Sequence, residues 1–426
     1  MGALWCRLFI PLLMTYGLLF AEKDAFAVSQ WISGQQPSYY ALSVGVLLAL
    51  YLACLAYLPS RLARSGAFLV WAVRCANLLI ATVFVAALIK TANPLTAGSL
   101  AMHDGIPIFV IWLILFRDET GEIYLAAYLL IQMTLAGLVL AMPDLEFLDG
   151  RTYQRDRGAF TLDPTIDHGL VLDKLAVGDY GVFHNPNALG FYSATIVALG
   201  VYFVLKYRPF PLLLGWYCIA LGAIGWVHSL TRGPAIALIG SAALVGVLAA
   251  VRQGGAKFLF VFSAGIFIGI LLLIAPHDAL EVLFPSVETA SVTGRIDGLR
   301  DGWRAIETYP LLGAPSFGYW EGRTVPHFYP IYVAANFGVV AGSVASIFLL
   351  LFPCGVLVWL TRSYLRARCS AATFWKLTSV LAICLAIIVT NNIASPFLIW
   401  ASIAQVVTSS SRMNFRPVQT RSTARR

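Results

Sequence analysis

The feature that most constrains this chain is its succession of apolar runs, each long enough to cross a lipid bilayer. A helix needs roughly 20 apolar residues to span about 30 Å of hydrocarbon. Only 12% of the 426 residues are charged, whereas soluble domains carry about 25%. We therefore predict an all-α, polytopic integral membrane protein of about 12 transmembrane helices, with residues 1–426 forming a single transmembrane domain. The predicted spans are residues 4–20, 39–58, 67–89, 97–116, 122–142, 187–205, 210–228, 234–251, 257–275, 331–359, 374–391 and 393–408.

Basic residues indicate how these spans are oriented. With the N-terminus inside, every predicted inward loop carries lysine or arginine, and so does the segment after the last span. Cytoplasmic loops of membrane proteins are enriched in these residues. We therefore predict cytoplasmic termini, a basic cytoplasmic tail over 409–426, and outward loops over 143–185 and 276–328, the larger between the ninth and tenth spans. The net charge of +8 then reflects topology, and nucleic acid is not an expected partner.

The first apolar run admits two interpretations. Arg7 precedes an apolar stretch, as a basic residue does in a secretory signal peptide, but no convincing small-residue cleavage site follows. We expect a retained first span, with a cleaved signal peptide as the alternative.

The outward loop 276–328 contains a helical pattern. Apolar residues recur at spacings of three, four and three, and charged residues fill the other side, which is typical of a surface helix. Pro310 is expected to end it. The helix either lies in the membrane interface, with its tryptophan inward and its arginines near phosphates, or packs on the rest of the loop. The apolar set is Ile296, Leu299, Trp303 and Ile306; the charged set is Asp297, Arg300, Asp301, Arg304 and Glu307.

All six histidines fall in predicted outward loops or at the outer ends of predicted spans, which indicates an outward-facing active or binding surface. One of them begins the motif His184-Asn185-Pro186-Asn187, where the sixth span starts. Asn185 can cap that helix and Pro186 fits its first turn. Helix capping is therefore an alternative to a functional role for this motif.

A second motif, Thr231-Arg232-Gly233-Pro234, opens the eighth span on the predicted outer side. An arginine at a helix N-terminus lies beside free backbone N–H groups and the positive end of the helix dipole, and together these make an anion site. The alternative is an arginine that anchors the helix at the membrane interface.

Arg295 and His327 lie at the two borders of the charged part of the large loop. A guanidinium makes bidentate, permanently charged contacts with phosphate oxygens. An imidazole, with an ordinary pKa near 6.5, can accept a proton from an attacking hydroxyl near neutral pH. Each residue on its own is equally consistent with an ordinary loop position.

Together these motifs resemble the O-antigen ligase and polymerase superfamily of bacterial envelope glycan assembly. The resemblance lies in HNPNALGFY, TRGPAIAL, TGRIDGLRDGW, YPLLG, His327 and Gly338, in this order, and covers roughly residues 180–345. Ligases of the family follow the histidine with Asn, Ser or Gln and end the motif with Gly, Thr or Tyr. Here Phe328 follows the histidine and Ala341 stands at the last position. These departures leave both ligase and polymerase open.

The resemblance implies a membrane glycosyltransferase. It would move a glycan from undecaprenyl diphosphate to a hydroxyl of a glycan or lipid-core acceptor, with inversion, at the periplasmic face of a bacterial inner membrane. The leaving diphosphate is a stable anion that needs positive charge more than a proton, and the attacking hydroxyl needs a base. The implied site consists of His327 as the catalytic residue, Arg232 and Arg295 as diphosphate ligands, and His184, Asn187 and Arg300 in support.

No cofactor or metal ion is required for this reaction. Asp144 and Glu146 form a closely spaced acidic pair in the outward loop 143–185, so a metal-dependent version is the alternative. The expected partners are the lipid-linked donor, the acceptor and membrane lipids.

Two other classes of function compete with the enzyme. A lipid-linked glycan flippase or other transporter would place charged or broken-helix sites near the middle of the membrane, whereas the candidate residues here gather at the predicted outer face. A structural or sensor protein would use the two outward loops to bind a partner.

Overall fold

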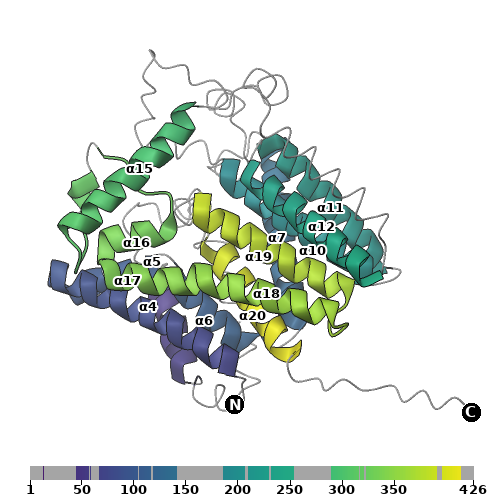
Figure 1. Cartoon of the computed structure of the whole chain (residues 1–426), viewed down its shortest axis with the longest axis horizontal. Helices are drawn as coiled ribbons and strands as arrows, with labels where there is room; N and C mark the ends of the chain where they lie inside the picture. The colour runs from purple at the N-terminus through teal and green to yellow at the C-terminus, as the bar shows by residue number, and fades with distance from the viewer. Residues whose placement is uncertain are drawn as a thin grey trace, which may run out of the picture.

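The computed structural model describes residues 13, 45–56, 58, 67–103, 105–116, 119–141, 186–206, 210–229, 232–253, 289–315, 317–320, 323–390 and 396–413. All regular structure among them is helical (Figure 1), which confirms the all-α prediction for this part of the chain. Several predicted features lie outside the described residues: the spans 4–20 and 257–275, the loop 143–185, His184, and the tail from 414 onward.

The described helices follow the predicted apolar runs closely in most places. In chain order they are α4 (Ala67–Thr91), α5 (Pro94–His103), α6 (Ile106–Leu115), α7 (Glu119–Ala141), α10 (Pro186–Lys206), α11 (Phe210–Ser229), α12 (Arg232–Gln253), α15 (Thr289–Thr308), the 3₁₀ turn η3 (Phe317–Trp320), α16 (Tyr329–Phe337), α17 (Val339–Ser346), the π turn η4 (Ile347–Leu351), α18 (Phe352–Leu365), α19 (Ala371–Thr390) and α20 (Pro396–Met413). Because α20 continues to Met413, residues 409–413 belong to a helix and not to the predicted tail.

Among the described residues, four helical stretches are long and apolar enough to cross a membrane: Leu69–Thr91, Ala188–Lys206, Val339–Leu365 and Ala371–Ile388. Shorter apolar helices accompany them, including Ile106–Leu115 and Phe397–Ser409. These helices support a membrane protein, while the total of about twelve spans stays a prediction.

The prediction of one span over 97–116 was wrong. The structure has two short helices there, α5 and α6, and α5 packs back against α4. The chain turns at Gly105, whose φ of 67° lies in the left-handed region that glycine adopts without steric cost. An apolar stretch of sufficient length can therefore contain a reversal that hydropathy does not reveal.

The prediction of one span over 331–359 was also wrong at its beginning. α16 ends at Phe337, and the long apolar helix starts only at Val339. Between them Gly338 has a φ of 91°, and a Cβ at this position would overlap the carbonyl group of Leu311. The first turns of the predicted span therefore form a separate helix packed on α17.

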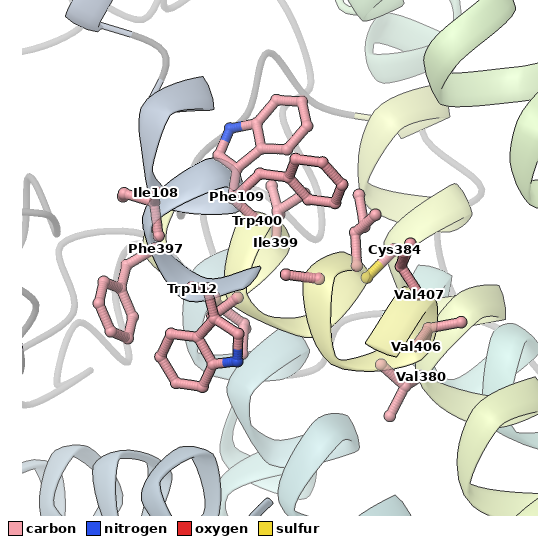
Figure 2. Close-up of a cluster of buried hydrophobic side chains, with 14 of the residues drawn as sticks. Ile108, Phe109, Trp112, Val380, Cys384, Phe397, Ile399, Trp400, Val406 and Val407 are labelled. Carbon is pink, nitrogen blue, oxygen red and sulfur yellow. The ribbon is translucent and has the colours of Figure 1, made fainter. Parts of the chain in front are cut away.

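The core is built around α6 and α20. α6 is apolar on all sides and buried along nearly its whole length, as expected for a helix inside a bundle. Figure 2 shows Phe109 and Trp112 of α6 beside Phe397 and Trp400 of α20. The Phe109 and Trp400 rings lie 6.4 Å apart edge to face, and Trp112 and Phe397 lie 5.8 Å apart. Such geometry lets large rings fill the interior without voids.

The ends of the helices fall into two groups. Arg252, in the last turn of α12, donates to the carbonyl of Cys369 in the α18–α19 connection (3.4 Å). Tyr202, near the end of α10, holds Lys376 of α19 over its ring at 4.7 Å. Because α10 and α12 are each about 30 Å long, their first residues lie at the other end of the bundle, where α17 begins. We call these the α18–α19 end and the α15 end.

Candidate functional site

The predicted amphipathic helix corresponds to α15, which in Figure 1 runs across the direction of the neighbouring spans. It packs through its smallest residues. A Cβ at Gly298 would lie 2.9 Å from the Val325 carbonyl oxygen, and one at Gly302 would overlap the Pro326 ring. Ala305 is fully buried in a small apolar cluster. The glycines thus allow residues 324–326 to lie directly against the helix backbone.

The larger apolar residues of α15 do not make this contact. Ile296, Leu299 and Trp303 are 51%, 40% and 56% exposed, while Ile306 packs partly against the small cluster. The helix therefore packs on the rest of the loop through glycine and alanine, and because its larger apolar residues stay exposed, the two sequence-based alternatives do not exclude each other. The stripe on which the prediction was based remains on the surface.

The chain after α15 is tied to the start of α17 by backbone hydrogen bonds. The Val339 N–H donates to the Pro310 carbonyl (2.8 Å), and the Ala314 N–H donates to the Ala335 carbonyl (2.7 Å). Gly313, with a φ of 74°, sits so close to Asn336 that a side chain would overlap its backbone. The segment 309–314 is therefore fixed against α16 and α17.

Asn336 organises the interior of this region. Its side-chain oxygen accepts from Trp320 Nε1 (2.9 Å), and its side-chain nitrogen donates to the Tyr332 carbonyl (2.9 Å). Lys90, in the last turn of α4, donates to the Ala314 carbonyl (2.7 Å) and to the Asn336 carbonyl. A side chain from a distant span thus anchors the α15–α16 region to the bundle.

His327 lies two residues before α16 and is partly buried. Shortly before it, the Thr324 N–H donates to Asp301 Oδ2 of α15 (3.0 Å). The next residue, Phe328, accepts from the Tyr332 N–H at the start of α16 (3.0 Å). His327 and α15 therefore belong to one packed unit, at the α15 end of the bundle.

Arg295 and Arg300 are both exposed on α15, but they lie on different sides of it. Five residues along a helix correspond to about 500°, so the two positions are about 140° apart. Arg300 Nη1 is 3.1 Å from Asp297 Oδ1. The two arginines therefore start from different sides of α15, and the supporting role of Arg300 stays a prediction.

Arg232 and Asn187 occupy the first turns of α12 and α10, which pack against each other. By the helix directions given above, both first turns lie at the α15 end. From these helix directions we infer that Arg232, Asn187, Arg295 and His327 lie toward the same end of the bundle, and their convergence on one site stays a prediction. Their functional roles stay predictions.

One charged pair in the interior was missed by the sequence analysis. Lys376 of α19 forms an ion pair with Glu122 of α7, and their side chains are only 3% and 6% exposed. Tyr202 of α10 holds the Lys376 ammonium over its ring, and its hydroxyl accepts from Lys206 Nζ (2.5 Å). The sequence analysis counted both as inward residues at the ends of the predicted spans 122–142 and 374–391, although charges at such positions are often paired.

The described residues contain no group of three or more His, Cys, Asp or Glu side chains able to hold a metal ion. Asp144 and Glu146, the pair considered for a metal, lie outside them. Comparison with protein-family models and with curated proteins finds no match to this chain.

Proposed function

We propose that the protein is a membrane glycosyltransferase that moves a glycan from undecaprenyl diphosphate to an acceptor hydroxyl at the outer face of a bacterial inner membrane. The observation that supports this proposal most is the shared location of Arg232, Arg295 and His327 at the α15 end of the bundle. A lipid-borne diphosphate is confined to the membrane surface, so residues that act on it must lie at one membrane face.

In the proposed reaction the acceptor oxygen forms a bond to the anomeric carbon of the glycan. The bond from that carbon to the diphosphate oxygen breaks, and the electron pair leaves with the diphosphate. His327 accepts the hydroxyl proton, which raises the nucleophilicity of the acceptor. The reaction needs no oxidant, reductant or nucleotide, because the donor already carries its leaving group.

Arg232 is suited to the leaving group by its position. It is the first residue of α12, where several backbone N–H groups have no partner within the helix and the helix dipole is positive. A guanidinium at that point adds a full charge with two parallel donors. An anion that gains charge as the glycosidic bond breaks is stabilised more in the transition state than in the ground state.

The acceptor is a hydroxyl either of a lipid core, as for a ligase, or of a growing glycan, as for a polymerase. Phe328, in place of a polar residue after His327, supports the polymerase. The two are distinguished by the product: chains of graded length attached to the carrier lipid for a polymerase, and glycan attached to a lipid core for a ligase.

Alanine substitutions in cells test the proposal. His327→Ala is expected to lower glycan product by roughly 10²- to 10⁴-fold, the usual contribution of a general base, and Arg232→Ala and Arg295→Ala are expected to lower it as well. Glycan blots measure the product, with immunoblots of the protein for expression. Arg304→Ala is the matched control, because Arg304 lies on the same helix and faces Asp301 (3.6 Å).

Normal product from both His327→Ala and Arg232→Ala would contradict the proposal. Loss of product from the Arg304 control at equal protein level would indicate a general effect of charge on α15 and would remove the assignment of Arg295.

A transporter of lipid-linked glycan is the second candidate, favoured by the buried Glu122–Lys376 pair. Ionisable residues inside membrane bundles commonly line transport or proton paths. Deletion of the gene distinguishes the two candidates. Lipid-linked glycan accumulating on the inner leaflet indicates transport, and accumulation on the outer leaflet indicates transfer.

A further inference from the structure

α15 presents an apolar stripe that its own packing keeps on the surface. The stripe consists of Ile296, Leu299 and Trp303, which fall within about 60° of one another around the helix. Gly298 and Gly302 lie about 110° around the helix from the middle of the stripe, and they are pressed against residues 324–326. Any larger residue on that side would collide with this backbone. The rotation of the helix is therefore fixed, and the stripe cannot turn inward.

The chain that follows the stripe leads directly to a candidate membrane span with exposed apolar side chains. Immediately after α15, Leu311 is 79% exposed. Its neighbour Pro310 is hydrogen-bonded to Val339, the first residue of the candidate span Val339–Leu365. That span exposes apolar side chains along its whole length at positions 340, 347, 351, 358 and 365. The C-terminal end of α15 thus lies next to the end of a candidate span whose exposed side chains are apolar.

Charged residues border the stripe in the manner of a helix at a membrane surface. Arg295 and Arg300 lie on its two sides, because the 140° between them contains all three apolar positions. Glu307 lies beyond Trp303 at the C-terminal end of the helix. Tryptophan is enriched at the depth of lipid headgroups, and arginines beside an apolar face attract phosphate groups.

We propose that α15 lies in the membrane interface, with the Ile296–Leu299–Trp303 stripe inserted at the boundary between headgroups and acyl chains, and with Arg295 and Arg300 at phosphate depth. The occupant of the stripe is the lipid leaflet at the α15 end. This inference is independent of glycan transfer. It holds equally if the protein is a transporter, because it depends only on the packing of α15 and on the adjoining span.

Site-directed spin labelling of the full-length protein tests the position of the helix. Leu299→Cys and Arg304→Cys are labelled separately, the second as a matched position on the polar side. Cys6, Cys75 and Cys354 are replaced by alanine, and the signal of this parent is subtracted. The protein is reconstituted in vesicles of phosphatidylethanolamine and phosphatidylglycerol. Collision of the nitroxide with oxygen, which concentrates in lipid, is compared with collision with a water-soluble nickel chelate.

The label at 299 is expected to collide severalfold more with oxygen than with nickel, and the label at 304 is expected to show the reverse preference. Dominant nickel collisions at 299 would overturn the proposal, since the stripe would then face water. Low collision with both reagents would also overturn it, because protein would cover the stripe. Dipolar broadening between labels at 299 would identify that protein as a second copy of the chain.

Discussion

The two ends of the bundle each hold a lysine in a protected place, and the partners of the two lysines differ. At the α18–α19 end, Lys376 pairs with the carboxylate of Glu122 in the interior. At the α15 end, Lys90 donates to the main-chain carbonyls of Ala314 and Asn336. Each ammonium also lies over an aromatic ring, Lys376 over that of Tyr202 at 4.7 Å and Lys90 over that of Phe337 at 5.6 Å.

The two lysines therefore have different structural roles. A buried carboxylate and ammonium neutralise each other and join α7 to α19 without offering charge to a ligand. Carbonyl groups are dipoles, so Lys90 instead holds in place the segment that leads to α15 and α16. Exposed arginines lie at both ends: Arg295, Arg300 and Arg304 on α15, and Arg252, Arg362, Arg366 and Arg368 at the α18–α19 end. The two ends therefore differ in how their protected lysines are bound, and both expose positive charge.

Removal of the buried Lys376 ammonium is expected to cause the largest loss of stability. Lys376→Met leaves the Glu122 carboxylate buried without its partner, which typically costs roughly 3–5 kcal/mol. The thermal unfolding midpoint of the detergent-solubilised protein measures the loss. The double variant Glu122→Gln with Lys376→Met is the control, because it removes both charges and should recover most of the stability. A single variant as stable as the parent protein would show that the pair does not hold the helices together.

Lys90→Met is expected to cause an intermediate loss of stability. It leaves the Ala314 and Asn336 carbonyls without this donor, and a buried polar group that loses its partner costs about 1–3 kcal/mol. Because the damage is local, limited proteolysis should cleave the segment 309–328 faster than in the parent protein. Lys90→Arg retains a donor and should protect the segment partly. Unchanged cleavage in Lys90→Met would mean that backbone hydrogen bonds alone hold this region.

Arg300→Ala is expected to have the smallest effect on stability. Its side chain is 59% exposed and its partner Asp297 is 41% exposed, and surface pairs of this kind contribute about 0–1 kcal/mol. The unfolding midpoint should barely change, and added salt should remove what difference there is. A loss as large as that of Lys376→Met would indicate a structural role for Arg300 that its exposed position does not suggest.

The sequence predicted the type and approximate limits of most described helices, because apolar runs of span length have few structural alternatives. It also predicted that α15 would be amphipathic and would end before Pro310, since proline lacks the N–H that a helix interior needs. It failed at Gly105 and Gly338, where the chain reverses or breaks within an apolar run. Hydropathy measures apolar length and is insensitive to one left-handed residue.

For the candidate site, the sequence predicted that Arg232, Asn187, Arg295 and His327 lie on the outer side of the membrane, and this stays a prediction. The sequence analysis did not use the five-residue spacing of Arg295 and Arg300, which by itself places them about 140° apart around a helix. Which side of α15 is buried could not be predicted, because a glycine face gives no hydrophobic signal.

By itself, the sequence determined that this chain is a helical membrane protein. The free energy of burying apolar side chains is a sum over residues, so the composition of each apolar run predicts it. Only the tertiary structure decided how Glu122 meets Lys376, how Lys90 reaches residues more than 200 positions away, and which side of α15 is exposed. These contacts join distant segments, and they depend on close packing between particular side chains and backbones.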